Sequence, residues 1–132
     1  MRDLTIDGAD NGIRIKSDRS RGGLVNDVAY EDVCMRDVKN PVLLTTSYTT
    51  RPGDKLPVYR DILLNNVRSV TPGRVTVTGL DEEHKIAASF RNVFIEGERK
   101  VEHADVVITI TGQGRAPACE FPPMPDVAPY LK

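Results

Sequence analysis

The sequence is poor in cysteine and in long apolar runs, and it carries almost no net charge. Two cysteines among 132 residues are too few for a disulfide scaffold or a zinc module. No apolar run approaches the ~18 residues that a membrane-spanning helix needs, and the first residues lack the apolar stretch of a signal peptide. A formal net charge of −1 lacks the basic excess of a nucleic-acid or anionic-membrane binder. We therefore expect no membrane and no nucleic acid among the partners of this chain.

Valine and isoleucine dominate the aliphatic side chains, with 23 of them against nine leucines. Their stiff, branched side chains are costly in helices and pack well in strands. Ten glycines and nine prolines are scattered at short intervals, which leaves little room for a helix. Apolar and polar residues alternate in 12–16, 74–78 and 106–111, as in half-buried strands. The chain is therefore predicted to be all-β.

A weak internal repeat indicates stacked units. Asp27, Asp61 and Asn92 each precede a β-branched residue with a second apolar residue two positions further on. They recur at intervals of about 30 residues, which lies within the range of solenoid repeats. Coils of a parallel β-solenoid fit this pattern. The short, evenly spaced strands of an antiparallel sandwich fit it as well, so the periodicity alone leaves both folds open.

The composition changes near residue 115. Five of the nine prolines lie in 117–129, and proline cannot continue a hydrogen-bonded sheet ladder. We therefore expect residues 1–114 to form the β-structure and residues 115–132 to form a proline-rich tail.

One strand could bind a ligand through its outer face. In Gly12-Ile13-Arg14-Ile15-Lys16 the two isoleucines should point inward and the two basic residues outward. The Cα atoms of Arg14 and Lys16 would then lie ~6.6 Å apart, two rises of an extended strand. At this spacing a planar guanidinium and an ammonium can share one carboxylate. A solvated strand face has the same alternating pattern.

Residues 12–28 resemble the last signature block of the polygalacturonases, the pectin-degrading enzymes of glycoside hydrolase family 28. The block comprises the Arg-Ile-Lys motif, a glycine-rich turn and the strand behind it. The turn is Ser17-Asp18-Arg19-Ser20-Arg21-Gly22-Gly23, and it looks most like that of the exo-acting bacterial members. The similarity continues through 30–33 and 40–44 to Tyr48 and, more weakly, to 119–123. The resemblance implies a right-handed parallel β-helix that hydrolyses α-1,4-linked galacturonate with inversion of configuration.

The resemblance also implies a binding site. Arg14 and Lys16 would hold a galacturonate carboxylate beside the scissile bond, and Tyr48 would stack on a sugar or bind its hydroxyl groups. An alternative for Tyr48 is a half-exposed aromatic residue at a strand end. The turn that follows either lines the same cleft or is solvated, and its charged residues are Asp18, Arg19 and Arg21. The family's mechanism needs no metal or cofactor, so we expect none.

The catalytic blocks of the family are missing from the sequence. An Asn-Thr-Asp, an Asp-Asp and a Gly-His-Gly block should precede Arg-Ile-Lys, and none occurs. We therefore assign no catalytic residue and expect a β-helix truncated to its C-terminal coils, inactive by itself. His84 and His103 lie among charged residues, as solvated loop histidines do. The aspartates before the motif suit turn or edge positions: Asp3, Asp7 and Asp10.

The expected partners are pectin or polygalacturonate oligosaccharides and the missing N-terminal coils. Self-association through the exposed first coil would replace those coils, and it would involve Leu4, Ile6, Ile13 and Ile15. Two alternatives are a non-catalytic module that binds acidic polysaccharide and a structural β-solenoid or sandwich. The resemblance alone implies a secreted or periplasmic location.

The two cysteines leave one question open. Cys34 falls in a predicted strand, where we expect a buried, inert thiol. The alternative is a Cys34–Cys119 disulfide, as in a secreted protein, which requires a Cα–Cα distance that the sequence does not supply.

Overall fold

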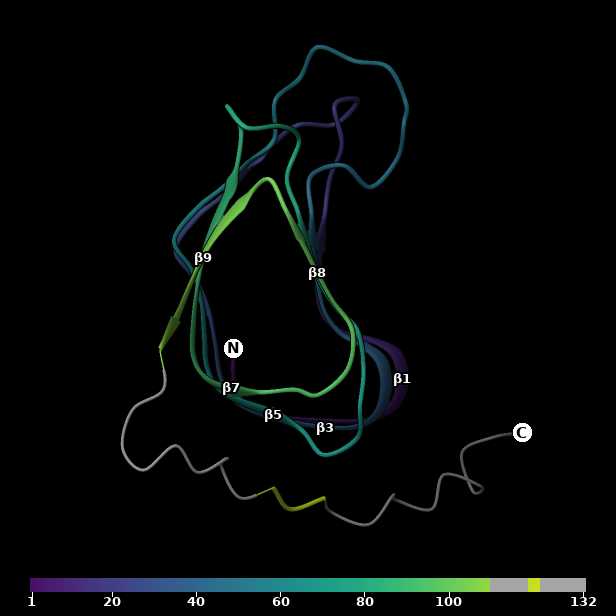
Figure 1. Cartoon of the computed structure of the whole chain (residues 1–132), viewed down its shortest axis with the longest axis vertical. Coiled ribbons are helices and arrows are strands. Elements are labelled where there is room, and N and C mark those ends of the chain that lie inside the picture. Colours follow the sequence, from purple (N-terminus) through teal and green to yellow (C-terminus); the bar gives the residue numbers. More distant parts are fainter. Residues whose placement is uncertain (110–118, 122–132) are drawn as a thin grey trace, which may run out of the picture.

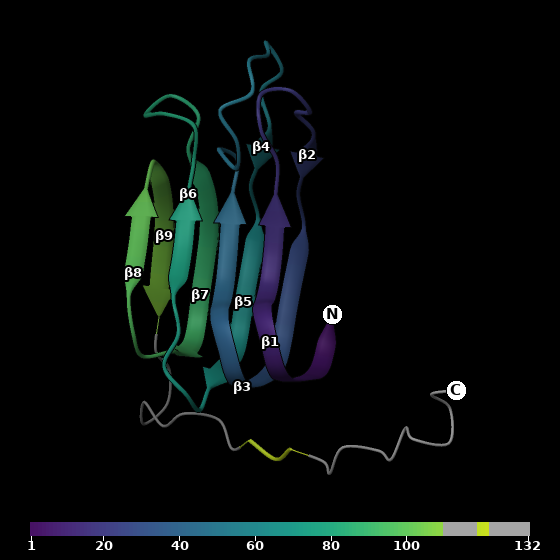
Figure 2. The ribbon, with the colours of Figure 1, turned by 90° about the vertical axis from the view of Figure 1, so that its right-hand side faces the viewer.

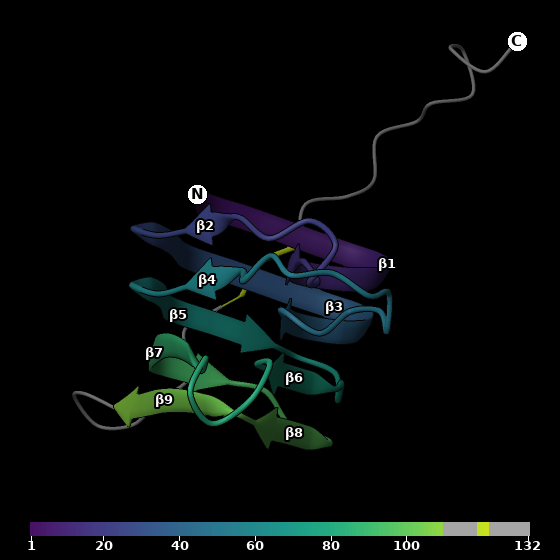
Figure 3. The ribbon, with the colours of Figure 1, turned by 90° about the horizontal axis from the view of Figure 1, so that it is seen from above.

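Parallel strands coil around a common axis in the computed structural model, which describes residues 1–109 and 119–121. Viewed along that axis, successive coils of the chain overlie one another (Figure 1), and from above their strands lie in a stack (Figure 3). The stacked strands are β1 (Arg2–Lys16), β3 (Val28–Thr45), β5 (Ile62–Ser69), β7 (Ile86–Phe94) and β9 (Ala104–Thr109), each parallel to the next. The fold is a parallel β-helix, as predicted, and the antiparallel sandwich is wrong.

The long strands β1 and β3 bend around the coil and contribute to a second face. On that face, β3 pairs with β6 (Val75–Thr78), and β6 pairs with β8 (Arg99–Glu102). These seven strands form one sheet, and a separate small sheet joins β2 (Leu24–Val25) to β4 (Val58–Tyr59). In the described part of the chain there is no helix long and apolar enough to cross a membrane.

Aspartate and asparagine form the corners of the coils. Asp3, Asp32, Asn66 and Asn92 stack in register, and each has a positive φ of 53–57°. Short polar side chains tolerate this left-handed backbone and can bond across the corner. Asn66 Nδ2, for example, donates to Asp32 Oδ1 at 3.2 Å.

The predicted repeat placed one of these residues in the wrong column. Asp27 and Asp61 do stack, because Val28 pairs with Ile62, but Asn92 does not belong with them. The connection from β3 to β4 runs over residues 46–57, whereas the connection from β6 to β7 needs only 79–85. Because the coils differ in length, a fixed spacing along the sequence cannot give the register.

Aliphatic side chains fill the interior in columns along the axis. Ile13, Val42 and Val75 form one column, and Leu44 and Val77 belong to its neighbour. All five are at least 95% buried. Arg14 and Lys16, which alternate with the isoleucines of β1, are exposed, so the predicted inward and outward faces of this strand are confirmed.

The two ends of the stack differ in their apolar exposure. In the first coil Ile13 is buried, whereas Leu4, Ile6 and Ile15 are half-buried. At the other end, Ile108 is 62% exposed. Association of the first coil with a second copy stays a prediction.

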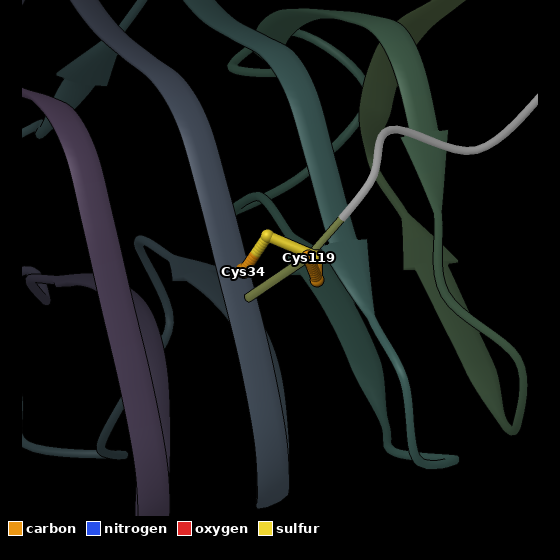
Figure 4. The surroundings of a disulfide bond; sticks show 2 residues. All are labelled: Cys34 and Cys119. Atoms are coloured by element: carbon orange, nitrogen blue, oxygen red, sulfur yellow. A yellow bond between two sulfur atoms is a disulfide. The ribbon is translucent and has the colours of Figure 1, made fainter. Parts of the chain in front are cut away.

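Cys34 and Cys119 form a disulfide with a Cα–Cα distance of 5.6 Å (Figure 4). The prediction of a buried thiol was therefore wrong. Cys34 lies on the outer face of β3, because its neighbours Val33 and Met35 both point into the core. The guanidinium of Arg36 lies 4.4 Å from the ring centroid of Phe121, so residues 119–121 pack on this outer face. The rest of the predicted tail, 115–118 and 122–132, lies outside the described residues.

Candidate functional site

Two loops leave the coils at the same end of the strands. Residues 17–23 follow β1 and residues 46–57 follow β3, and Figure 2 shows both projecting together above the sheet. Backbone hydrogen bonds join them: Tyr48 N donates to Ser17 O at 3.1 Å, and Lys55 N donates to Arg19 O at 3.1 Å. Because β1 and β3 are paired in register, loops from successive coils meet above the end of β1.

The three residues predicted to bind substrate lie together at this point. Arg14 Nη2 donates to Tyr48 Oη at 3.2 Å. Lys16 Nζ lies 4.1 Å from the centroid of the Tyr48 ring, and the guanidinium carbon of Arg14 lies 5.5 Å from it. Both distances are in the range of cation–π contacts. The tyrosine ring thus bridges two cations of β1, and at 47% exposure it remains accessible.

A cleft of about 260 Å³ opens between the two loops beside Tyr48. Arg14 contacts Tyr48 but is not among the residues that line the cleft. Those residues carry three cations and one carboxylate, and they are Lys16, Ser17, Asp18, Arg21, Tyr48, Thr49 and Arg51. The site is therefore electropositive.

Asp18 is buried at 5% exposure and lines the cleft, so at this position the turn lines the cleft and is not solvated, which is the first of the two alternatives for it. Its Oδ1 accepts hydrogen bonds from the amides of Ser20 (2.9 Å) and Arg21 (3.2 Å) and from the Ser20 hydroxyl. Its Oδ2 accepts from Thr49 Oγ1 at 2.6 Å, which ties the first loop to the second. The hydroxyls of Ser20 and Thr49 stabilise the charged form and lower the pKa of Asp18 to about 2. The spacing Asp18-x-Ser20 is a turn signal that could have indicated these bonds.

We expect the junction between the loops to weaken in acid. The pKa of Asp18 is about 2 in the folded protein against 3.8 ordinarily. Its contribution to stability is therefore complete above about pH 4 and is lost as the pH falls toward 2. Thermal unfolding measured between pH 5 and 2 should show a shallower pH dependence for Asp18→Asn than for the wild type.

A control separates this effect from general acid sensitivity. The pKa of Asp7 is also lowered, by its hydrogen bonds to Arg36 on the outer face of the coils. Asp7→Asn should change the melting temperature at low pH without shifting the amide resonance of Thr49. Asp18→Asn should shift that resonance. If the melting temperatures of the wild type and of Asp18→Asn fell equally between pH 5 and 2, the acid sensitivity could not be assigned to Asp18.

Gly53 lets the two loops approach each other closely. A Cβ atom at this position would lie 2.1 Å from Arg19 O and 2.9 Å from the Cα of Ser20, both backbone atoms. Gly53→Ala should therefore destabilise the fold by about 1–3 kcal/mol, as overpacking usually does, and increase protease cleavage in 46–57. Asp54→Ala, at an exposed neighbour, should change neither the melting temperature nor the cleavage. If the two variants had the same melting temperature and the same protease cleavage, the close approach of the two loops would not contribute to stability.

The other charged residues singled out from the sequence lie elsewhere. Arg19 Nη2 is 3.3 Å from Asp81 Oδ2, in the loop 79–85 that follows β6. His84 Nδ1 contacts Asp81 Oδ1 at 2.8 Å, and His103 Nδ1 contacts Glu82 Oε1 at 2.9 Å. These histidines lie in loops as predicted, but each is paired with an acid rather than simply solvated.

The three aspartates before the motif have structural positions. Asp3 occupies a corner, Asp7 pairs with Arg36, and Asp10 Oδ1 lies 3.6 Å from Lys39 Nζ. Within residues 1–109 and 119–121, no three or more histidine, cysteine or acidic side chains gather in a way that could hold a metal.

Comparisons with known proteins match this chain to a family. A family model described as glycosyl hydrolases family 28 matches residues 1–112. An endo-polygalacturonase of Pectobacterium parmentieri is 38% identical over 91 residues, which cover 69% of this chain and 23% of that protein. An endo-polygalacturonase of Pectobacterium carotovorum subsp. carotovorum is 33% identical over 106 residues (80% and 26%). A polygalacturonase of Ralstonia solanacearum is 44% identical over 70 residues (50% and 13%).

The chain thus covers between 13% and 26% of the length of these three relatives. No solved structure matches it.

Proposed function

Because the chain belongs to glycosyl hydrolases family 28, we propose that it forms a substrate-binding part of a polygalacturonase that hydrolyses α-1,4-galacturonosidic bonds in pectin. The observation that carries the proposal is the set of cations around Tyr48. These four cations are Arg14, Lys16, Arg21 and Arg51. None of them forms an ion pair with a residue that the structure describes. Other arginines, such as Arg36, have an acidic partner. Three of these unpaired cations line the cleft and the fourth, Arg14, contacts Tyr48 beside it. Such a site suits an anionic ligand, and polygalacturonate carries one carboxylate on each sugar.

Each side chain of the site has a distinct task in this proposal. The Arg14 fork donates two parallel N–H groups to the carboxylate of a galacturonate residue, and Lys16 adds a point charge beside it. Tyr48 offers its ring face to the sugar, and its hydroxyl can bond to a sugar hydroxyl while Arg14 holds it in place. Binding at this point orients the scissile bond, which accelerates the reaction by positioning rather than by proton transfer.

The acid–base chemistry then belongs to coils outside this chain. Inverting hydrolysis uses two carboxyl groups about 6.5–9.5 Å apart, one to protonate the leaving oxygen and one to activate water. The one carboxylate in the cleft lining, Asp18, is already engaged by Ser20, Arg21 and Thr49. We therefore propose that the chain is inactive alone and that its partner is the N-terminal β-helix of the same enzyme. The disulfide favours an oxidising compartment, in line with secretion or export to the periplasm.

The test is release of reducing ends from polygalacturonate. The chain should be silent alone and active when joined to the part of the Pectobacterium parmentieri relative that precedes the matching segment. The same chimera with Arg14→Gln serves as the control and should lose most of its activity. Turnover by the isolated chain would show that Asp7, Asp10 or Asp18 supplies the acid–base chemistry. Binding of oligogalacturonate with no activity in the chimera would identify a non-catalytic acidic-polysaccharide module.

A further inference from the structure

The last coil leaves two strands of the large sheet with a free edge. Within the described residues β8 pairs only with β6, and β9 pairs only with β7. Figure 2 shows both strands at the end of the stack away from β1. An apolar groove of about 300 Å³ opens over this end, and Val101, Val106 and Ile108 are among the residues that line it. Val101 is 50% exposed and Ile108 is 62% exposed. An apolar edge of this kind is a template on which another strand can pair.

The hydrogen bonds of β8 show which backbone groups its free edge offers. Gly79 N donates to Glu102 O at 2.9 Å, so the backbone of Glu102 faces β6. Glu98 O accepts from Val75 N in the same way, also at 2.9 Å. Successive residues of a strand direct their N–H and C=O groups to opposite edges. The N–H and C=O groups of Val101 therefore point away from β6, toward the free edge.

The side chains of β8 divide between the groove and the outer face. Val101 continues the buried column of Leu44 and Val77, and it lines the groove. Lys100 and Glu102 flank it in the sequence, and both are exposed. Neither forms an ion pair with another residue that the structure describes. The strand thus carries one free cation and one free anion on its outer face, with an apolar residue between them.

This order of residues is complementary to itself. When two copies of β8 pair antiparallel around a two-fold axis at Val101, each Val101 exchanges two backbone hydrogen bonds with its copy. Lys100 of each chain then lies opposite Glu102 of the other, in a non-hydrogen-bonded pair with Cα atoms about 4.5 Å apart. Opposite charges at such positions stabilise the pairing of two strands. The same axis places the two apolar grooves against each other.

We propose that this end of the stack is a dimer interface, in which β8 pairs with β8 of a second copy around Val101. A two-fold axis joins the same surface of both chains and closes the assembly. The interface lies at the last coil, so it leaves the first coil free for further coils. Arg14, Leu43, Thr76 and Lys100 stack in register on the outer face. Because the axis is perpendicular to that face, Arg14 of both copies lies on the same side of the dimer.

The test is sedimentation equilibrium of the full chain over a range of protein concentrations. The wild type should dimerise. Lys100→Glu and Glu102→Lys should each raise the dissociation constant of the dimer by about tenfold or more, because two attractive pairs become two repulsive ones. The double variant Lys100→Glu/Glu102→Lys restores both pairs with reversed polarity and should dimerise as the wild type does. Asp54→Lys makes the same change of charge as Glu102→Lys at an exposed loop residue, and as the matched control it should leave the dissociation constant unchanged.

Three outcomes would overturn the interface. The first is a wild type that stays monomeric at every concentration. The second is a dimer whose dissociation constant neither single reversal changes, because that dimer forms through another surface, such as the first coil. The third is a folded double variant that dimerises no better than the single variants. Circular dichroism confirms that each variant is folded, and if one reversal prevents folding, the other tests the same pair.

Discussion

Replacement of Arg14 by glutamine is expected to weaken oligogalacturonate binding by roughly 10- to 100-fold, the usual effect of losing hydrogen bonds to a charged group. The guanidinium lies at the end of β1 with one N–H on the Tyr48 hydroxyl and no acidic partner in the described residues. Glutamine keeps the polar side chain but removes the charge and the fork. Isothermal titration of the wild type and the variant with trigalacturonate measures the loss.

Three further variants identify which property of the site matters. Arg14→Lys retains the charge without the planar fork and should recover only part of the affinity. Lys16→Gln should have the smaller effect, about tenfold, because Lys16 contributes charge more than geometry. Arg91→Gln removes the same charge from a distant strand and should bind normally. Equal affinity in all four variants would show that the basic pair is only a solvated strand face.

Loss of the disulfide is expected to have the largest effect on stability. The bond joins residues 85 positions apart, and closing a loop of that length lowers the entropy of the unfolded chain. The free energy of unfolding should therefore fall by roughly 4–5 kcal/mol in a Cys34→Ser/Cys119→Ser variant. Urea denaturation of this variant, and of the wild type with and without a reductant, measures the change.

The same variant should retain its affinity for oligogalacturonate, because the disulfide lies on the outer face of β3 and not among the residues of the cleft. The reductant should leave the denaturation midpoint of the variant unchanged, which is the control for nonspecific effects. A wild type with the same midpoint in its oxidised and reduced forms would contradict the prediction. A large decrease would show that the fold depends on this disulfide, a bond that persists in oxidising compartments.

The local features of this chain could be predicted because they depend on neighbouring residues. Alternation in 12–16 determines which side chains of one strand share a face, so Arg14 and Lys16 were expected outside and Ile13 inside, as observed. The excess of valine and isoleucine determined the all-β class. The Arg-Ile-Lys block and the glycine-rich turn were sufficient for the family resemblance, which the match to residues 1–112 confirms.

Only the tertiary structure decided which coils bring which residues together. Asn92 was assigned to the wrong column because the connections between strands differ in length. The pairing of Cys34 with Cys119 depends on where the chain returns after 85 residues. Buried Asp18 accepts a hydrogen bond from Thr49 of the next coil, and Arg51 joins the cleft from the same loop as Thr49. The alternation along the sequence determines which residues of one strand share a face. The lengths of the connections between strands determine which residues of different coils lie side by side.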